Sequence, residues 1–112
     1  MKTPQAVKAL AALAQDTRLA VYRMLVQQGP DGLAAGTIAE RLELPGATLS
    51  FHLKELANAG MVESRQEGRF VFYSANFDQM NGLLGYLTEN CCQGRGCLTE
   101  CAPRPQANRK RA

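Results

Sequence analysis

The chain has 112 residues, of which 46% are hydrophobic and 21% are charged, a balance typical of one globular domain with a modest core. No apolar run approaches the ~20 residues of a transmembrane helix, and Lys8 and Gln15 interrupt the apolar stretch that a secretory signal would need. We therefore expect a cytoplasmic protein without membrane contact, in which cysteine thiols stay reduced.

The formal net charge of +3 is concentrated in the C-terminal tail. Arg104, Arg109, Lys110 and Arg111 all lie within residues 102–112. Without these four, nine of the thirteen basic residues remain against ten acidic residues, so the net charge becomes −1. Any nucleic-acid surface on the folded part must then be a local patch. The tail has two prolines and little apolar content, which predicts disorder.

Hydrophobic periodicity predicts helices over most of the first half of the chain. The first covers residues 4–14, and the second follows Asp16 as its N-cap and ends at Gly29. A third, short helix is expected over about residues 35–42, and a fourth over about residues 46–58. A short helix, a brief turn and a helix with a polar outer face together indicate a helix-turn-helix.

The pattern changes from helical to alternating after Gly60. Two strands are predicted around a two-residue turn at Glu67-Gly68. The alternating positions are Val62, Ser64, Gln66, Arg69, Val71 and Tyr73. A last helix is expected over residues 77–90, with an apolar stripe of Met80, Leu83, Leu84 and Leu87. Since a hairpin directly follows the helix-turn-helix, the predicted fold is mainly α with a small β-hairpin wing, a winged helix-turn-helix.

Two stretches, DTRLAVYRML and IAERLELPGATLSFHLKELANAGMVESRQEGRFVFY, resemble the ArsR/SmtB family of metal-sensing repressors. The resemblance covers residues 5–90, although Pro45-Gly46 stands where the family usually has a serine cap. It implies a homodimer that binds double-stranded operator DNA and leaves it when a metal ion or metalloid binds. We accordingly expect residues 1–90 to bind DNA and dimerise through the first and last helices, residues 91–101 to sense the ion, and residues 102–112 to form the basic tail.

The outward face of the fourth helix is the predicted DNA-reading surface, because the leucines of this helix point inward at ~100° per residue. The candidate groove residues are Ala47, Thr48, Ser50, Phe51, His52 and Lys54. Hydroxyl groups suit phosphates or base edges, a lysine suits phosphate, and Phe51 suits thymine methyl groups. His52 is the only histidine, and we expect it to pack or to bond phosphate rather than to bind a metal.

The predicted wing carries Arg65 and Arg69 on either side of its turn. A wing that follows a groove helix meets the DNA backbone or the minor groove, which makes both arginines candidate DNA contacts. A solvated hairpin with Arg–Glu pairs is the alternative interpretation.

All four cysteines lie within residues 91–101. Many family members carry cysteines on the helix before the recognition helix, and others use histidines on the last helix. This chain has neither, so the cluster after the last helix remains. Soft thiolates select soft ions, and trivalent arsenic or antimony bonds three sulfurs in a pyramid. Cys91, Cys92 and Cys97 are therefore the candidate ligands of As(III) or Sb(III), with Cys101 as a spare thiol or a fourth ligand.

Other interpretations of the cysteines stay open. A zinc or cadmium ion would take all four thiolates, although the spacing C-C-x4-C-x3-C lacks the CxxC knuckles of structural zinc. A thiol redox switch would need no ion, and a metallochaperone would bind the ion but not DNA. An enzyme is not expected, because the chain has neither a C-x5-R loop nor a CxxC near a βαβ pattern. The sequence thus predicts an arsenite- or antimonite-responsive transcriptional repressor.

Overall fold

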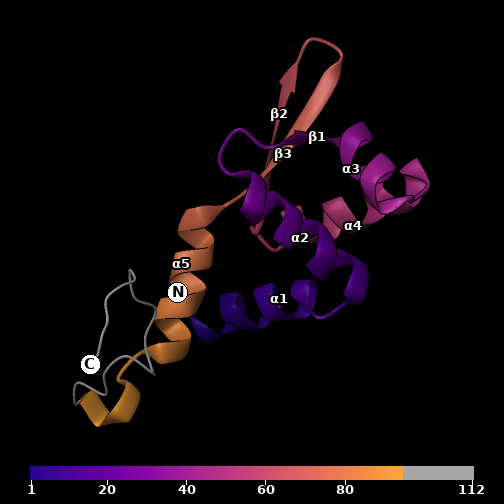
Figure 1. Ribbon diagram of the computed structural model, residues 1–112. Coiled ribbons are helices and arrows are strands. Elements are labelled where there is room, and N and C mark those ends of the chain that lie inside the picture. The colour runs from indigo at the N-terminus through magenta and orange to yellow at the C-terminus, as the bar shows by residue number, and fades with distance from the viewer. Residues whose placement is uncertain (95–112) are drawn as a thin grey trace, which may run out of the picture.

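Figure 1 shows the computed structural model of the protein, which describes residues 1–94 of the 112, so that Cys97, Cys101 and the tail lie outside the described residues. The elements in chain order are α1 (Thr3–Leu13), α2 (Asp16–Gln28), β1 (Leu33–Ala34), α3 (Ala35–Leu42), α4 (Gly46–Asn58), β2 (Val62–Glu67), β3 (Phe70–Ala75), α5 (Phe77–Thr88) and the 3-10 turn η1 (Cys91–Gly94). A helix-turn-helix, α3 and α4, precedes the hairpin β2–β3, which confirms the predicted winged helix-turn-helix. None of the described helices is long and apolar enough to span a membrane.

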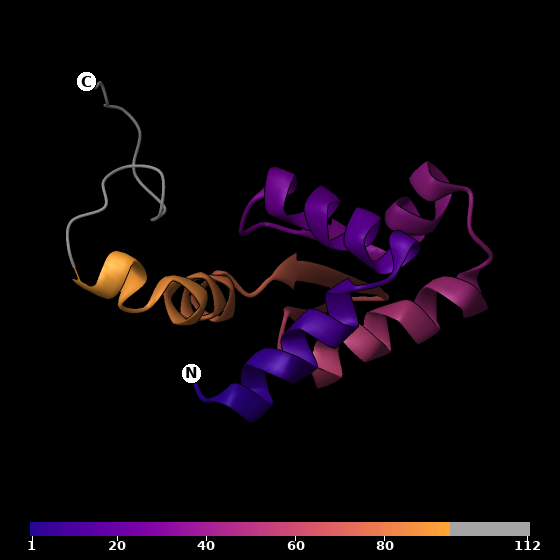
Figure 2. The ribbon, with the colours of Figure 1, turned by 90° about the horizontal axis from the view of Figure 1, so that it is seen from below.

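The core lies where α1, α2, α3 and α4 meet the base of the wing. Each helix contributes the side chains of one face, as its 3.6-residue period requires. The largest fully buried side chains are Val21, Tyr22, Leu25, Ile38, Leu49, Leu53, Leu56 and Met61. Figure 2 shows α5 to one side of the packed helices, joined to them through β3. Among the side chains of α5, Leu83 alone is fully buried, so the helix leaves much of its apolar stripe near the surface.

The starts of the first two helices differ slightly from the prediction. α1 begins at Thr3, one residue earlier, and has Pro4 in its first turn, where a missing N–H costs nothing. α2 begins at Asp16, and its N-cap is Gln15, whose Oε1 accepts a hydrogen bond from the backbone N–H of Arg18 at 2.8 Å. Gln15 has the extended backbone of an N-cap, and Asp16 lies in the first turn, where the helix dipole favours a carboxylate.

α5 ends at Thr88, two residues before the predicted end at Asn90. The Thr88 hydroxyl donates to the carbonyl oxygen of Leu84 at 2.8 Å. Asn90 then has a left-handed backbone with a φ of 56°, which an α-helix does not allow. The helix therefore stops before Cys91, so Cys91 and Cys92 lie outside it without any unwinding of its last turn.

The wing turn lies one residue later than predicted. Strands β2 and β3 pair antiparallel with Glu67 opposite Phe70, so the turn residues are Gly68 and Arg69. Gly68 has a φ of +64°, and two-residue hairpin turns favour glycine at such a position. Arg69 is therefore in the turn itself, at the end of the wing.

A short strand that the sequence pattern does not predict, β1, extends the sheet to the order β1-β3-β2. Its residues Leu33 and Ala34 lie opposite Tyr73 and Phe72. Gly32 comes just before it, and a Cβ at this position would lie 2.3 Å from the Tyr73 carbonyl oxygen, so a larger residue would push the strands apart. This pairing joins the wing to the segment between α2 and α3.

Candidate functional site

The outer face of α4 is open to solvent as predicted. Leu49, Leu53 and Leu56 are buried, and they turn the opposite side of the helix outward. The exposed side chains on this outer side include Ala47, Thr48, Ser50, Phe51 and Lys54. Phe51 is 56% exposed, which is unusual for a phenylalanine on a polar helix face and suits a groove contact.

His52 lies at the flank of α4, half-buried rather than exposed. Its ring meets the Phe51 ring edge-on, with centroids 5.5 Å apart. Its Nδ1 atom is 3.3 Å from Nη1 of Arg18, a residue of α2. Arg18 was not among the residues predicted from the sequence, although it lies in the DTRL stretch that carries the family resemblance.

The two wing arginines have different surroundings. Arg65 forms an ion pair with Glu67 and donates from Nη2 to the carbonyl oxygen of Asp31 at 2.9 Å. Its guanidinium also lies 5.0 Å from the centre of the Phe72 ring. The Arg–Glu pair that was the alternative interpretation of the hairpin is thus present, and Arg65 braces the wing against the loop after α2. Its role as a DNA contact stays a prediction.

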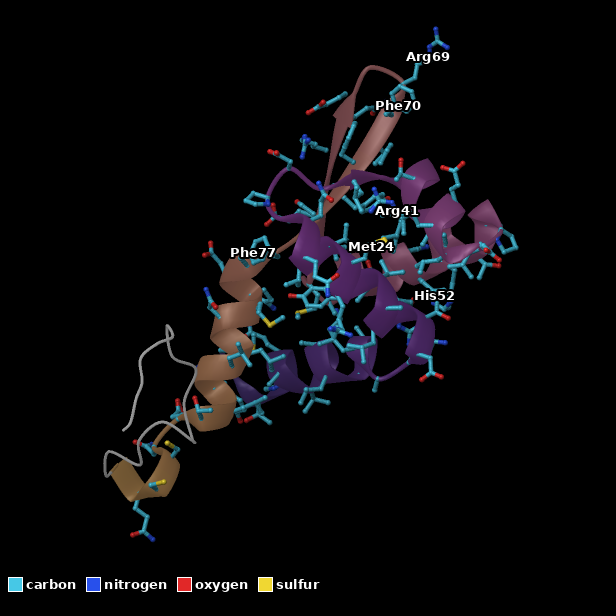
Figure 3. The ribbon with its side chains drawn as sticks, in the orientation of Figure 1. Met24, Arg41, His52, Arg69, Phe70 and Phe77 are labelled. Atoms are coloured by element: carbon cyan, nitrogen blue, oxygen red, sulfur yellow. The ribbon has the colours of Figure 1, made fainter. Side chains whose placement is uncertain are left out.

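Arg69 extends beyond the end of the wing. Figure 3 shows it pointing away from the domain, next to Phe70, which is 63% exposed. Nothing else in the described part of the chain reaches past this point in the view. A guanidinium in this place can approach a DNA backbone without first leaving a partner among residues 1–94.

The described part of the cysteine cluster follows α5 directly. Cys91 is half-buried and Cys92 is exposed. Both lie in η1, where Cys92 and Gln93 have positive φ values of 55° and 59°. Within residues 1–94 there is no group of three or more cysteine, histidine or carboxylate side chains that would hold a metal. Cys97 and Cys101 lie outside the described residues, so the predicted site of Cys91, Cys92 and Cys97 stays a prediction.

Helices α1 and α5 expose apolar side chains. On α1, alanines face the core, whereas Val7 and Leu10 are 58% and 41% exposed. On α5, Leu84 and Leu87 are 37% and 53% exposed. The Thr3 hydroxyl and the Tyr86 hydroxyl form a hydrogen bond that connects the two helices. We call Val7, Leu10, Leu84 and Leu87 the α1–α5 apolar face.

Tyr22 is a buried side chain whose hydroxyl has no hydrogen-bond partner among the described residues. It also lines an apolar groove of about 320 Å³ together with residues of α2 and with Met80 of α5. Burial raises the pKa of the Tyr22 hydroxyl above its usual value, because the ionised form would lose its hydration.

Comparisons with known proteins agree with this architecture. A helix-turn-helix domain family matches residues 13–65. The transcriptional activator HlyU of Vibrio cholerae is 34% identical over 89 residues, which are 80% of this chain and 80% of that protein. Its solved structure has a TM-score of 0.64 at 33% identity and covers 83% of this chain and 100% of that chain.

Two further relatives extend the comparison. The arsenical resistance operon repressor of Bacillus subtilis is 33% identical over 81 residues, 72% of this chain and 73% of that protein. A homodimeric winged helix-turn-helix DNA-binding domain from Mycobacterium bovis has a TM-score of 0.63 at 26% identity and covers 82% of this chain and 85% of that chain. These relatives confirm the expected family and exclude the enzyme alternative. The chain belongs to the ArsR family of winged helix-turn-helix transcriptional regulators, which are DNA-binding proteins and not enzymes.

Proposed function

We propose that this protein is a homodimeric transcriptional repressor that leaves its operator when As(III) or Sb(III) binds Cys91, Cys92 and Cys97. The observation that carries the proposal is the position of the thiols directly after α5, the helix that exposes Leu84 and Leu87. An ion bound there would restrain the end of a helix that we assign to the dimer interface.

The DNA-reading part of the proposal rests on α4 and the wing. We assign α4 to the major groove, with Ser50 and Phe51 near base edges and Lys54 near phosphate. Ala47, Thr48 and His52 lie on the same side or at the flank of this helix, and we place them at the same interface. Arg69 at the wing tip suits the backbone or the minor groove, and Arg65 would reach DNA only from its braced position beside Asp31.

The dimer part of the proposal rests on the α1–α5 apolar face. Burial against a second copy would remove these side chains from water, which favours association. A related winged helix-turn-helix domain from Mycobacterium bovis is homodimeric. Two α4 helices in a symmetric dimer would read half-sites about 10 base pairs apart or a multiple of that.

The effector part of the proposal rests on the chemistry of the thiols. Cys91 and Cys92 are adjacent, differ in exposure and follow the end of α5. Thiolates prefer soft ions. One relative is an arsenical resistance operon repressor, which supports a trivalent arsenical as the ion. Binding would have to favour a dimer whose two α4 helices no longer match the operator.

A gel-shift titration with operator DNA, with and without arsenite, tests this function. The unmodified protein should bind the operator and leave it when arsenite is added. Cys91→Ser, Cys92→Ser and Cys97→Ser should each bind the operator normally and stay bound in arsenite, since a serine hydroxyl does not replace a soft thiolate. Cys101→Ser is the matched control and should be released normally.

Other outcomes identify other effectors. If all four substitutions abolish release equally and cadmium or zinc releases the unmodified protein, a four-thiolate divalent site replaces the arsenite site. If an oxidant releases the protein and arsenite does not, the cysteines form a redox switch. A protein that binds arsenite but never binds DNA would be a buffer or chaperone, and the repressor proposal would be wrong.

A further inference from the structure

Arg18 joins three parts of the domain that are separate in the sequence. It lies in the first turn of α2, where its backbone N–H donates to Gln15. Its Nε donates to the carbonyl oxygen of Ala12, near the end of α1, at 2.7 Å. Its Nη1 lies 3.3 Å from Nδ1 of His52 on α4. Figure 3 shows His52 beside the first turn of α2. One half-buried guanidinium thus connects α1 and α2 to the flank of the recognition helix.

The contact between Arg18 and His52 determines which ring nitrogen of the histidine carries the proton. A guanidinium has only N–H donors, so Nδ1 of His52 must be the acceptor in this hydrogen bond. A neutral imidazole with an accepting Nδ1 carries its proton on Nε2. Nε2 has no hydrogen-bond partner among the described residues, so its N–H can serve as a donor to a group outside the domain. The edge-on contact with the Phe51 ring further restricts the ring orientation.

We propose that Arg18 is a positioning residue of the DNA-reading surface: it holds His52 as the Nε2–H tautomer, so that this N–H donates to operator DNA. The proposal rests on the docking of α4 described above. Arg18 itself stays within the domain in this arrangement, because the Ala12 carbonyl and the histidine occupy its guanidinium. Its effect on DNA affinity passes through His52, and no phosphate contact of its own is involved.

The alternative role for Arg18 is a direct phosphate contact. Arg18 lines an open cavity of about 420 Å³ together with Lys8 and Glu55, so part of its surface is accessible. The two roles predict different salt dependence. A residue that neutralises a phosphate contributes about 0.9 to the slope of log K against log salt, whereas a residue that only orients a neutral histidine contributes nothing to it.

A double-mutant cycle on operator affinity tests the proposal. Arg18→Met keeps the aliphatic stem and removes the donors, and it should weaken operator binding roughly tenfold with an unchanged salt slope. His52→Gln places an amide N–H near the position of Nε2 and needs no tautomer control. Adding Arg18→Met to His52→Gln should therefore cost no further affinity. Arg23→Met, an exposed arginine on the same helix, is the matched control and should bind as the unmodified protein does.

Nitrogen NMR of the imidazole supplies an independent measurement, because His52 is the only histidine of the chain. The unmodified protein should show one neutral tautomer with the proton on Nε2, and Arg18→Met should show averaging between the two tautomers. If Arg18→Met unfolds the domain, Arg18→Lys serves in its place. It keeps the charge but lacks the planar fork that reaches two acceptors at once, so it should show the same averaging and the same loss of affinity.

Three results would overturn the proposal. A salt slope lowered by about 0.9 in both His52 backgrounds would make Arg18 a direct phosphate contact. Equal losses from Arg18→Met in both backgrounds would show that it does not act through His52. If Arg18→Met and His52→Gln bind the operator normally and Lys54→Ala binds weakly, the role of Arg18 is rejected and the docking of α4 is kept. Normal binding by Lys54→Ala and Arg69→Ala as well would instead reject the docking of α4 and the wing.

Discussion

Arg65 and Arg69 are close together in the wing, but their contacts differ. Arg65 lies against Glu67, the Asp31 carbonyl and the Phe72 ring, whereas Arg69 occupies the turn and points away from the domain. Exposed ion pairs such as Arg65–Glu67 contribute little to the free energy of unfolding. We therefore assign Arg65 the role of fixing the orientation of the hairpin relative to the loop after α2. Arg65 therefore orients the wing, whereas the side chain of Arg69 is available to DNA.

The first prediction follows from this difference. Lys54→Ala and Arg69→Ala should weaken operator binding and nonspecific DNA binding together, and each should lower the salt slope by about 0.9. Arg65→Ala should change the slope less, because its guanidinium already has partners within the chain. Phe51→Ala or Ser50→Ala should instead change which base pairs are preferred. Fluorescence anisotropy over a salt series measures all of these, and unchanged slopes for Lys54→Ala and Arg69→Ala would show that the docking is wrong.

A second prediction concerns Tyr22, whose buried hydroxyl has no partner among the described residues. Tyr22→Phe should leave the free energy of unfolding unchanged or raise it by about 1 kcal/mol, because it removes an unsatisfied polar group and leaves no cavity. The pKa of this hydroxyl is raised in the folded state, so above pH ~10 the unfolded chain ionises first and the unmodified protein loses stability. The advantage of phenylalanine should therefore grow above that pH.

Urea unfolding of both proteins at pH 7 and above pH ~10 measures this difference. A loss of about 1 kcal/mol or more at pH 7, the typical net contribution of one hydrogen bond, would mean that a partner subunit or a water molecule satisfies the hydroxyl.

At the scale of elements, α1 and α5 divide their side chains between two surfaces. α1 packs on the core through small residues, Ala6, Ala9 and Ala12, and turns its larger apolar residues outward. Small residues let the helix approach the core closely, and Val7 and Leu10 lie away from this buried face and are exposed. The same division on α5, with Leu83 inward and Leu84 and Leu87 outward, is what a helix with two packing partners requires.

The third prediction is that this face, and not the cysteines, holds the dimer. A variant with all four cysteines replaced by serine should sediment as a dimer, because burial of apolar surface needs no ion. Leu84→Asp with Leu87→Asp should sediment mainly as a monomer, since it would bury unpaired carboxylates. A monomeric cysteine-free variant would place the thiols or their ion within the interface.

At the scale of the whole molecule, the end of α5 and the wing that we assign to DNA lie far apart. Figure 1 places the wing and the end of α5 at opposite sides of the domain. Within the described residues, Cys91 and Cys92 follow the end of α5 away from the wing, so we expect their effect on DNA binding to pass through the helices. The Thr3–Tyr86 hydrogen bond and the Arg18–Ala12 hydrogen bond, one near each end of α1, make this helix the natural connection between α5 and α4.

The fourth prediction is reciprocal coupling between the two sites. If arsenite weakens operator binding by a given factor, operator DNA must weaken arsenite binding by the same factor. Calorimetric titration of arsenite into the protein with and without saturating operator measures this. Equal arsenite affinities with and without DNA, together with release of DNA by arsenite, would mean that release occurs by loss of folded protein rather than by a shift between two dimer states.

Local sequence signals were sufficient for much of the fold. The bounds of α3 and α4 agree with the prediction, because buried apolar residues at helical spacing, Ile38 in α3 and the leucines of α4, and the Pro45-Gly46 start of α4 are short-range features. The wing turn was predicted one residue too early, since both Glu67-Gly68 and Gly68-Arg69 contain the glycine and only the pairing of Glu67 with Phe70 distinguishes them. β1 was missed because two residues show no alternation, and it is a strand only through its pairing with β3.

The sequence by itself determined the helix-turn-helix with its wing and the outward side chains of α4, because both follow from periodicity and local spacing. The family followed from the resemblance of two stretches of the chain to known members. Only the tertiary structure decided what those side chains touch. It braced Arg65 against Asp31, left Arg69 at the wing tip, and brought Arg18 to His52 across 34 positions of the chain. Such contacts depend on how the helices pack against one another, and no pattern within a single helix or strand encodes the distance between two side chains on different elements.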